Sequence, residues 1–311
     1  MHTFFERKLK MPKKITLVSA AALVLFIILI VILINVSAEK PSSPFPQKVT
    51  VYLKERSEIV SLDYSEFLEG CLRGFLPENG DLYEPQTLEA LAVVVNTNAL
   101  YALQNRDKFE NYGADFSTGE LFPYTDKTPK PSAQALVRTA AEAAAEKFLA
   151  LDEKPVQLDF CRISSGKTIP KLPAMPSVNL PSDALCKGYL SKNAYTVNEV
   201  RALSEIKRLR EPPEEWFSEP VYDEYGTLVS VKICGQKITG EFIKNTLGLR
   251  SAAIEIGFED DCFVFICKGW GNNTGMSLAA ADTFSRDGKT YDEILAVFYS
   301  AKLENTQTTA R

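Results

Sequence analysis

The sequence predicts an α+β fold: a single mixed body with helices packed on a mainly antiparallel sheet, preceded by one N-terminal transmembrane helix. Three observations support this prediction. An uncharged apolar run occupies residues 15–36, segments with helical hydrophobic spacing recur along the remaining chain, and short strands joined by tight turns lie between them. About 270 residues follow the apolar run, which suffices for one large domain or two small ones.

The N-terminal segment has the length and charge pattern of a membrane anchor. Ile15–Val36 holds 22 residues without a charge, and at about 1.5 Å per residue it spans about 33 Å, enough for a hydrocarbon core of about 30 Å. Five of residues 1–14 are basic, which places that end in the cytoplasm and the main domain outside. A cleaved signal peptide ending near Ala38 is the alternative, but its apolar region would exceed the usual ~7–15 residues. We therefore expect an uncleaved, single-pass anchor in the cell membrane.

Behind this anchor we expect a linker, one domain and a tail. Prolines and serines over residues 37–48 predict a short extended linker. The folded domain then covers residues 49–303. Residues 304–311 are expected to be frayed, as chain ends commonly are.

Helical hydrophobic spacing identifies seven segments. Leu88–Leu103 is apolar nearly all round, which predicts a buried helix, so Asn96 and Asn98 within it require hydrogen-bond partners or a wet face. Thr196 and Glu199 have the spacing of a capping box. The predicted helices are Tyr64–Leu76, Leu88–Leu103, Ala133–Leu149, Thr196–Leu209, Gly240–Leu247, Leu278–Phe284 and Thr290–Tyr299.

Alternating or β-branched runs predict strands, four of them in two hairpins. The first hairpin turns at Gly235–Gln236 and the second at Glu259–Asp261. The predicted strands are Lys48–Leu53, Pro155–Arg162, Leu228–Cys234, Lys237–Ile238, Ala252–Gly257 and Cys262–Cys267.

Composition argues against several classes of site. The net charge is -5 with both signs mixed along the chain, which argues against nucleic acid as a partner. The one histidine, His2, precedes the apolar run, so a His-type zinc site, a Ser-His-Asp triad and a Cys-His dyad are excluded from the folded part. A metal would depend on thiolates and carboxylates alone, for example at Cys161 and Cys186. We expect neither a metal nor a cofactor.

Two glycine-bearing segments are candidates for a binding site. Lys268–Ser277 carries three glycines between a predicted strand and a predicted helix, where the backbone can turn tightly and approach a ligand closely. Many ordinary connections have the same layout. Ser164–Thr168 combines hydroxyls, a glycine and Lys167, which suits an anion or a sugar. It lacks the spacing of a nucleotide-binding loop, so a plain turn is at least as consistent.

Four segments carry an ordered likeness to a known family. The closing segment, KGWGNNTGMSLAAADTFSRDGKTYDEILAVFYS, is similar to K-G-[FW]-G-H-G-V-G-M-S-Q-Y-G-A followed by G-K-x-Y-x-E-I-L. Phe160–Thr168 is similar to F-F-H-S-T-S-G-G-x-T, and Gly70–Leu103 and Ile238–Ser251 match two further parts in order. Over residues 48–303 the chain thus resembles the stage II sporulation protein D family, also called the amidase-enhancer (SpoIID/LytB) family.

The resemblance implies a membrane-anchored, exported protein that acts on peptidoglycan during endospore formation. In that family the glutamate of an S-E-M-P turn is taken as the catalytic acid of a lytic transglycosylase, which cleaves glycan strands without water. Phe75 stands at the matching position of this chain. In the closing loop Asn272, Asn273 and Leu278 replace a histidine, a glycine and a glutamine.

These departures leave two functions open. The favoured one is a catalytically silent member that binds peptidoglycan glycan strands, with a cell-wall amidase and other membrane proteins of the sporulation machinery as further partners. The other is an active lytic transglycosylase with a relocated acid, for which Glu78 in the adjoining turn is the candidate. Trp270 offers a face on which a sugar ring can stack. The expected glycan-binding residues are Ser164, Ser165, Lys167, Lys268, Trp270, Asn272, Asn273 and Ser277.

Overall fold

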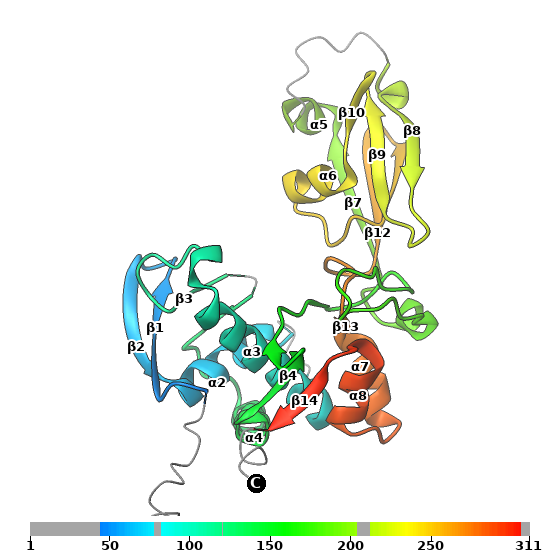
Figure 1. Cartoon of the computed structure of the whole chain (residues 1–311). Helices are drawn as coiled ribbons and strands as arrows, with labels where there is room; N and C mark the ends of the chain where they lie inside the picture. Colours follow the sequence, from blue (N-terminus) through cyan, green and yellow to red (C-terminus); the bar gives the residue numbers. More distant parts are fainter. Residues whose placement is uncertain (1–43, 78–81, 120, 204–211, 306–311) are drawn as a thin grey trace, which may run out of the picture. The chain divides into compact units, whose positions relative to one another are not determined.

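The computed structural model describes residues 44–77, 82–119, 121–203 and 212–305 (Figure 1). Residues 44–305 form one unit, in which helices accompany strands that pair mostly in the antiparallel direction. The α+β prediction is confirmed, but the strands within the described ranges form five small sheets where one sheet was expected. The predicted anchor, 15–36, lies outside the described residues. Within them, no helix is long and apolar enough to cross a membrane.

The first hydrophobic core surrounds helix α3, Pro85–Gln104. Its residues are buried on nearly every side, as the all-round apolar sequence predicts. Four helices and the strand β4, Lys147–Leu151, pack against it. These helices are α2 (Tyr64–Phe75), α4 (Pro131–Ala144), α7 (Leu278–Arg286) and α8 (Tyr291–Phe298).

The two asparagines inside α3 have the partners that their burial requires. Asn96 donates to the carbonyl of Ala144 at 2.8 Å and accepts from the Tyr64 hydroxyl at 3.1 Å. Asn98 donates to the Leu158 carbonyl at 2.9 Å and accepts from the Leu158 N–H at 2.8 Å. The Asn98 amide therefore bonds both backbone groups of one residue, Leu158.

Three of the sheets border this first core. The predicted strand β1 is confirmed and lies between β2 and β3, antiparallel to the former and parallel to the latter. β4 lies between β5 and β14, and the short β6 pairs in parallel with β13. The bounds are β1 Lys48–Leu53, β2 Glu58–Asp63, β3 Phe116–Ser117, β5 Lys154–Pro155, β6 Phe160–Cys161, β13 Met276–Ser277 and β14 Lys302–Asn305.

The predicted helix Ala133–Leu149 is too long. α4 ends at Ala144, Glu146 adopts a positive φ of 65°, and the chain continues as β4. A tertiary contact overrides the local helix preference here, because the Leu149 N–H donates to the Thr97 hydroxyl at 2.9 Å and β4 pairs with β14. Residues 304 and 305, which were assigned to a frayed tail, complete β14.

The predicted strand Pro155–Arg162 is interrupted. Only its ends belong to strands, Pro155 in β5 and Phe160–Cys161 in β6. Between them the Asn98 side chain bonds both backbone groups of Leu158. An amide side chain therefore satisfies the backbone where a neighbouring strand would otherwise do so.

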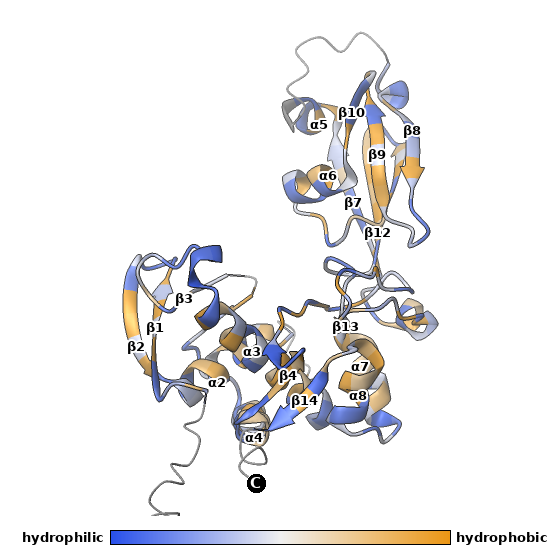
Figure 2. Ribbon diagram, viewed as in Figure 1, coloured by the Kyte–Doolittle hydropathy of each residue, from blue (hydrophilic) through white to orange (hydrophobic). Residues whose placement is uncertain are grey.

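A second hydrophobic core lies within residues 200–267, where Trp216 stacks on Phe263 with ring centroids 5.3 Å apart. One sheet has the order β11-β12-β7 and the other β10-β9-β8. The central strand β9 is orange along much of its length in Figure 2, in keeping with its buried residues. The bounds are β7 Leu190–Thr196, β8 Phe217–Tyr222, β9 Leu228–Ile233, β10 Gln236–Ile238, β11 Ile254–Glu259 and β12 Cys262–Lys268.

Local signals placed two helices of this region well. α6 spans Gly240–Leu247 as predicted and ends at Gly248, which adopts a left-handed conformation. α5 spans Val197–Leu203, and its capping box is present: the Thr196 N–H donates to the Glu199 carboxylate at 2.7 Å. The rest of the predicted helix, 204–209, lies outside the described residues. The first hairpin turn is displaced by one residue, because Gln236 pairs with Ile233.

Candidate functional site

Residues Lys268–Ser277, hereafter the glycine loop, connect β12 to α7 and approach the chain's own backbone at two points. Gly271 has a φ of 121°, and a Cβ there would lie 2.8 Å from the Cβ of Cys161. Gly275 has a φ of 65°, and a Cβ there would lie 1.8 Å from the carbonyl oxygen of Asp159. The loop ends in β13, which pairs with β6. Both glycines are therefore required for the contact between this loop and the segment containing β6.

Asn273 connects the glycine loop to the turn at residues 164–168. The Ser165 N–H donates to its Oδ1 at 2.9 Å, and its Nδ2 donates to the Ser165 hydroxyl at 2.8 Å and to the Lys167 carbonyl at 3.0 Å. The residue is 7% exposed and has a φ of 59°. Its amide is thus committed to the protein, and the two glycine-bearing segments predicted from the sequence lie together.

Replacing Asn273 should therefore cost stability. We expect Asn273→Ala to lower the free energy of unfolding by about 2–4 kcal/mol, because it leaves partly buried backbone groups of Ser165 and Lys167 unpaired and places alanine in a left-handed conformation. Asn272→Ala is the matched control. Asn272 is exposed, and among the described residues its side chain bonds to Asp159 and Thr274, so its loss should cost less than about 1 kcal/mol. Denaturant unfolding of both variants measures the difference, and equal costs would contradict the connecting role.

Asp183 is the buried centre of this loop cluster. Its Oδ2 accepts from the Ser164 N–H at 2.8 Å and from the Ser277 hydroxyl at 2.6 Å. Ser277 also caps α7 by accepting from the Ala280 N–H. Asp183, Ser164 and Ser277 are fully buried. Both predicted serines therefore bond to Asp183 inside the protein and are not exposed to a ligand in this structure. Asp183 lies in a 3-10 helix, Pro181–Leu185, within a proline-bearing stretch whose sequence carries no periodic signal for such a role.

A cleft of about 910 Å³ opens beside this cluster. Of the predicted site residues that the structure describes, Trp270 alone lines it. The guanidinium carbons of Arg162 and Arg250 lie 4.7 and 4.2 Å from the centroid of the Trp270 ring. The lining residues are Pro77, Leu82, Tyr83, Arg162, Ile163, Ser182, Leu185, Cys186, Lys187, Gly188, Arg250, Trp270, Ala279, Asp282, Thr283 and Arg286.

The remaining predicted residues lie beside the cleft or away from it. Lys268 pairs with Glu255 at 2.6 Å, and Lys167 pairs with Glu224 at 3.1 Å and lies over the Tyr225 ring. Asn272 is exposed and does not line the cleft. The predicted glycine-bearing segment therefore contributes Trp270 to the cleft, and the two arginines that share the cleft with Trp270 were not predicted from the sequence.

Acidic groups near the cleft are few. Phe75, at the end of α2, packs edge-on against Phe160 with ring centroids 4.8 Å apart, and Glu78 lies outside the described residues. Asp282 is the carboxylate among the described lining residues. Burial raises its pKa above the ordinary value, against the opposing effects of its bond from the Glu84 N–H at 2.7 Å and of Arg286, with which it forms an ion pair.

Tyr83, which also lines the cleft, has a pKa raised to about 12, because burial outweighs the lowering effect of the Arg162 charge. Its hydroxyl therefore stays protonated at neutral pH. In the part of the chain that the structure describes, no cluster of three or more His, Cys, Asp or Glu residues could hold a metal.

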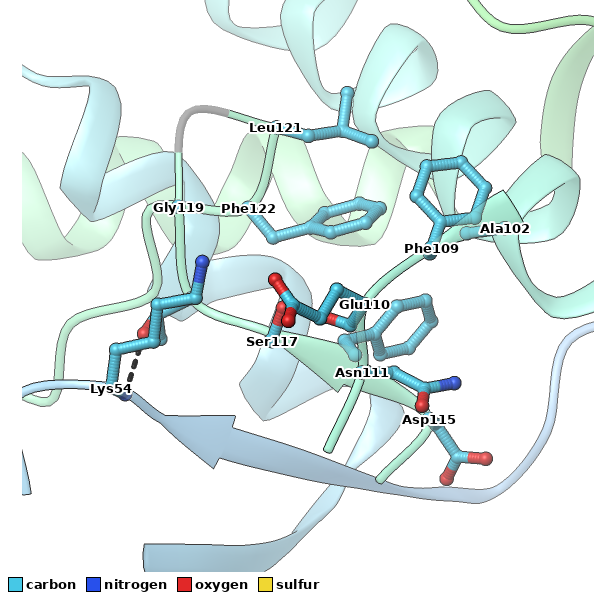
Figure 3. A pocket seen from close by; sticks show the side chains of 12 residues that line it. Lys54, Ala102, Phe109, Glu110, Asn111, Asp115, Ser117, Gly119, Leu121 and Phe122 are labelled. Carbon is cyan, nitrogen blue, oxygen red and sulfur yellow. Dashed lines mark hydrogen bonds between the residues drawn. The ribbon is translucent and has the colours of Figure 1, made fainter. Parts of the chain in front are cut away.

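A second, smaller cavity of about 220 Å³ lies against β3 (Figure 3). The side chains of Phe109, Leu121 and Phe122 gather on one side of it, while Lys54 and Asp115 lie at opposite ends of the view. The predicted site residues that the structure describes are absent from its lining. This cavity is therefore separate from the glycine loop and its cleft.

Comparison with known proteins shows a distant similarity over most of the chain. No protein-family model matches the chain. It is 23% identical over 280 residues to stage II sporulation protein D of Bacillus amyloliquefaciens, which covers 84% of this chain and 80% of that protein. It is 22% identical over 272 residues to stage II sporulation protein D of Bacillus subtilis (strain 168), which covers 82% and 78%. These two similarities, which extend over more than four-fifths of the chain, support its placement as a distant member of the stage II sporulation protein D family.

Proposed function

We propose that this chain is a membrane-anchored, peptidoglycan-associated protein of the sporulation type that binds glycan strands without cleaving them. The relationship to stage II sporulation protein D supports a role associated with sporulation. The apolar run 15–36 supports an anchor that leaves the main domain outside the cell membrane. The observation that carries the binding role is the cleft, whose size and mixture of aromatic, apolar and charged groups suit a sugar ligand.

The loss of cleavage follows from the chemistry of the departing sugar. Its oxygen requires a proton from a positioned acid, commonly a carboxyl group with a raised pKa. Phe75 supplies no proton and is held against Phe160 by an aromatic contact. Asp282 has both carboxylate oxygens bonded, one to the Glu84 N–H and the other to Arg286. It therefore serves as an anchor between α7 and the start of α3.

A turnover assay with peptide-stripped glycan strands tests this proposal. We expect the full-length protein to retain the strands in a co-sedimentation assay and to create no new strand ends by mass spectrometry, because no free acid faces the cleft among the described residues. The variant Phe75→Glu tests whether the side chain at this one position accounts for the absence of glycan cleavage. New strand ends from wild type that disappear in Glu78→Gln would contradict the proposal.

The alternative is an active lytic transglycosylase with a relocated acid. One observation favours it: Asp282 lines the cleft and has a raised pKa, as a general acid requires. Glu78 is the other candidate acid from the sequence. If wild type does cleave strands, the variants Asp282→Asn and Glu78→Gln identify which carboxyl group donates the proton.

A role as an amidase enhancer, which the family resemblance suggests, has its own test. Addition of the full-length protein to a cell-wall amidase acting on intact peptidoglycan should raise the rate of peptide release if the protein presents glycan to that enzyme. An unchanged rate would restrict the proposed function to glycan binding.

A further inference from the structure

Two half-buried cations in the cleft have no acidic partner in the part of the chain that the structure describes. Arg162 follows β6, and Arg250 lies between α6 and β11. Arg250 donates to the Gly188 carbonyl at 3.4 Å, and the Arg162 guanidinium carbon lies 4.7 Å from the centroid of the Trp270 ring. A guanidinium has five N–H donors. Most of the donors of these two residues are therefore available to a ligand.

Neighbouring cations differ in this respect. Lys268 is neutralised by Glu255, Lys167 by Glu224, and Arg286 by both Glu84 and Asp282. A partly buried cation that lacks a counter-charge costs free energy. Contact with the Trp270 ring offsets part of this cost for both cations. The arrangement therefore leaves two positive charges oriented by an aromatic ring at the wall of a cleft.

The surroundings of the two arginines indicate the class of anion. The guanidinium plane matches a carboxylate in a two-point hydrogen bond. Apolar residues, among them Pro77, Leu82 and Ile163, also line the cleft, and they suit a singly charged group on an apolar stem better than a strongly hydrated, multiply charged phosphate. Lys187 adds a further positive charge to the same lining.

We propose that Arg162 and Arg250 form a subsite that binds a carboxylate carried on a sugar. Trp270 holds the two arginines in place. This inference rests on the proposed glycan-binding function. Trp270 then acts as a positioning residue, because guanidinium groups already lie over its ring. The expectation that this ring serves as an open platform for a sugar is replaced by a role in orienting the two arginines.

Calorimetric titration of the full-length protein with two matched sugars tests the subsite. N-acetylmuramic acid and N-acetylglucosamine differ by an ether-linked carboxylate, and we expect the first to bind at least about tenfold more tightly, with a preference that weakens as salt is added. Arg162→Gln and Arg250→Gln should each remove most of this preference. Arg162→Lys and Arg250→Lys keep the charge without the planar fork and should retain part of it.

Lys192→Gln is the matched control, because Lys192, on β7, is an exposed cation paired with Glu259 on β11. It should leave the preference unchanged. Equal affinity for the two sugars, or an unchanged preference in both glutamine variants, would overturn the subsite. If lactate bound as tightly as N-acetylmuramic acid, the inference that the subsite requires a carboxylate carried on a sugar would be overturned.

Retention of glycan strands separates the two proposals. Strands retained by wild type without any preference for N-acetylmuramic acid would overturn the subsite and leave the proposed function intact. A preference for N-acetylmuramic acid without strand retention would overturn the proposed function and leave the subsite intact.

Discussion

Gly275→Ala is expected to lower the free energy of unfolding by about 3–5 kcal/mol. Gly275 has a φ of 65°, and an added Cβ would lie 1.8 Å from the Asp159 carbonyl oxygen. That carbonyl accepts hydrogen bonds from the Met276 N–H and the Tyr299 hydroxyl. The backbone must therefore move apart where the glycine loop joins β6, and these hydrogen bonds are strained or lost. Denaturant unfolding of the full-length chain measures the effect.

Gly248→Ala is the control that separates the two parts of this cost. Gly248 has a φ of 63°, nearly that of Gly275, but a Cβ there would meet nothing within 4 Å. It should show only the conformational cost of a left-handed alanine, about 1–2 kcal/mol. If both variants lose the same stability, the close approach at Gly275 contributes nothing. Glycan retention by Gly275→Ala should fall as well, because the loop carries Trp270 into the cleft.

The elements that could be predicted from the sequence are those with local signals. α6 was predicted to the residue, because apolar spacing and a glycine in the left-handed C-cap conformation both lie within a few positions. α3 was predicted from its all-round apolar sequence, including the need for partners at Asn96 and Asn98. The prediction of a helix over 133–149 was too long because the contacts that form β4 are not local. β4 depends on β14 and on the Thr97 hydroxyl, which are distant in sequence.

The candidate site shows the same division. The glycine loop and the turn at 164–168 were predicted separately, because each segment contains glycine and hydroxyl-bearing residues that are recognisable in the sequence. Asp183, which joins them, gives no local signal, because a buried aspartate in a proline-bearing loop looks like any solvated residue. Arg162 and Arg250 are equally ordinary in the sequence. Their importance depends on the closeness of both guanidinium groups to the Trp270 ring and on the lack of an acidic partner in the described structure. Neither property can be predicted from the spacing of residues in the sequence.

The largest effect outside the glycine loop is expected at Asn98. Asn98→Ala should lower the free energy of unfolding by about 3–5 kcal/mol, because it leaves the N–H and the carbonyl of buried Leu158 without partners and opens a small cavity. Leu158 lies two residues before β6, which pairs with the end of the glycine loop. The substitution should therefore also reduce glycan retention, although Asn98 does not line the cleft.

Asn105→Ala provides the matched control, because Asn105 caps the same helix and bonds only locally, to the Tyr101 carbonyl and to Lys108. Its cost should stay below about 1 kcal/mol. Asn98→Asp gives a sharper test, since the acceptor for the Leu158 N–H is kept and the donor to the Leu158 carbonyl is lost. A protonated carboxyl can replace that donor, so its stability deficit relative to wild type should shrink as the pH falls. A deficit that is independent of pH would mean that the two-point bond to Leu158 does not hold this segment in place.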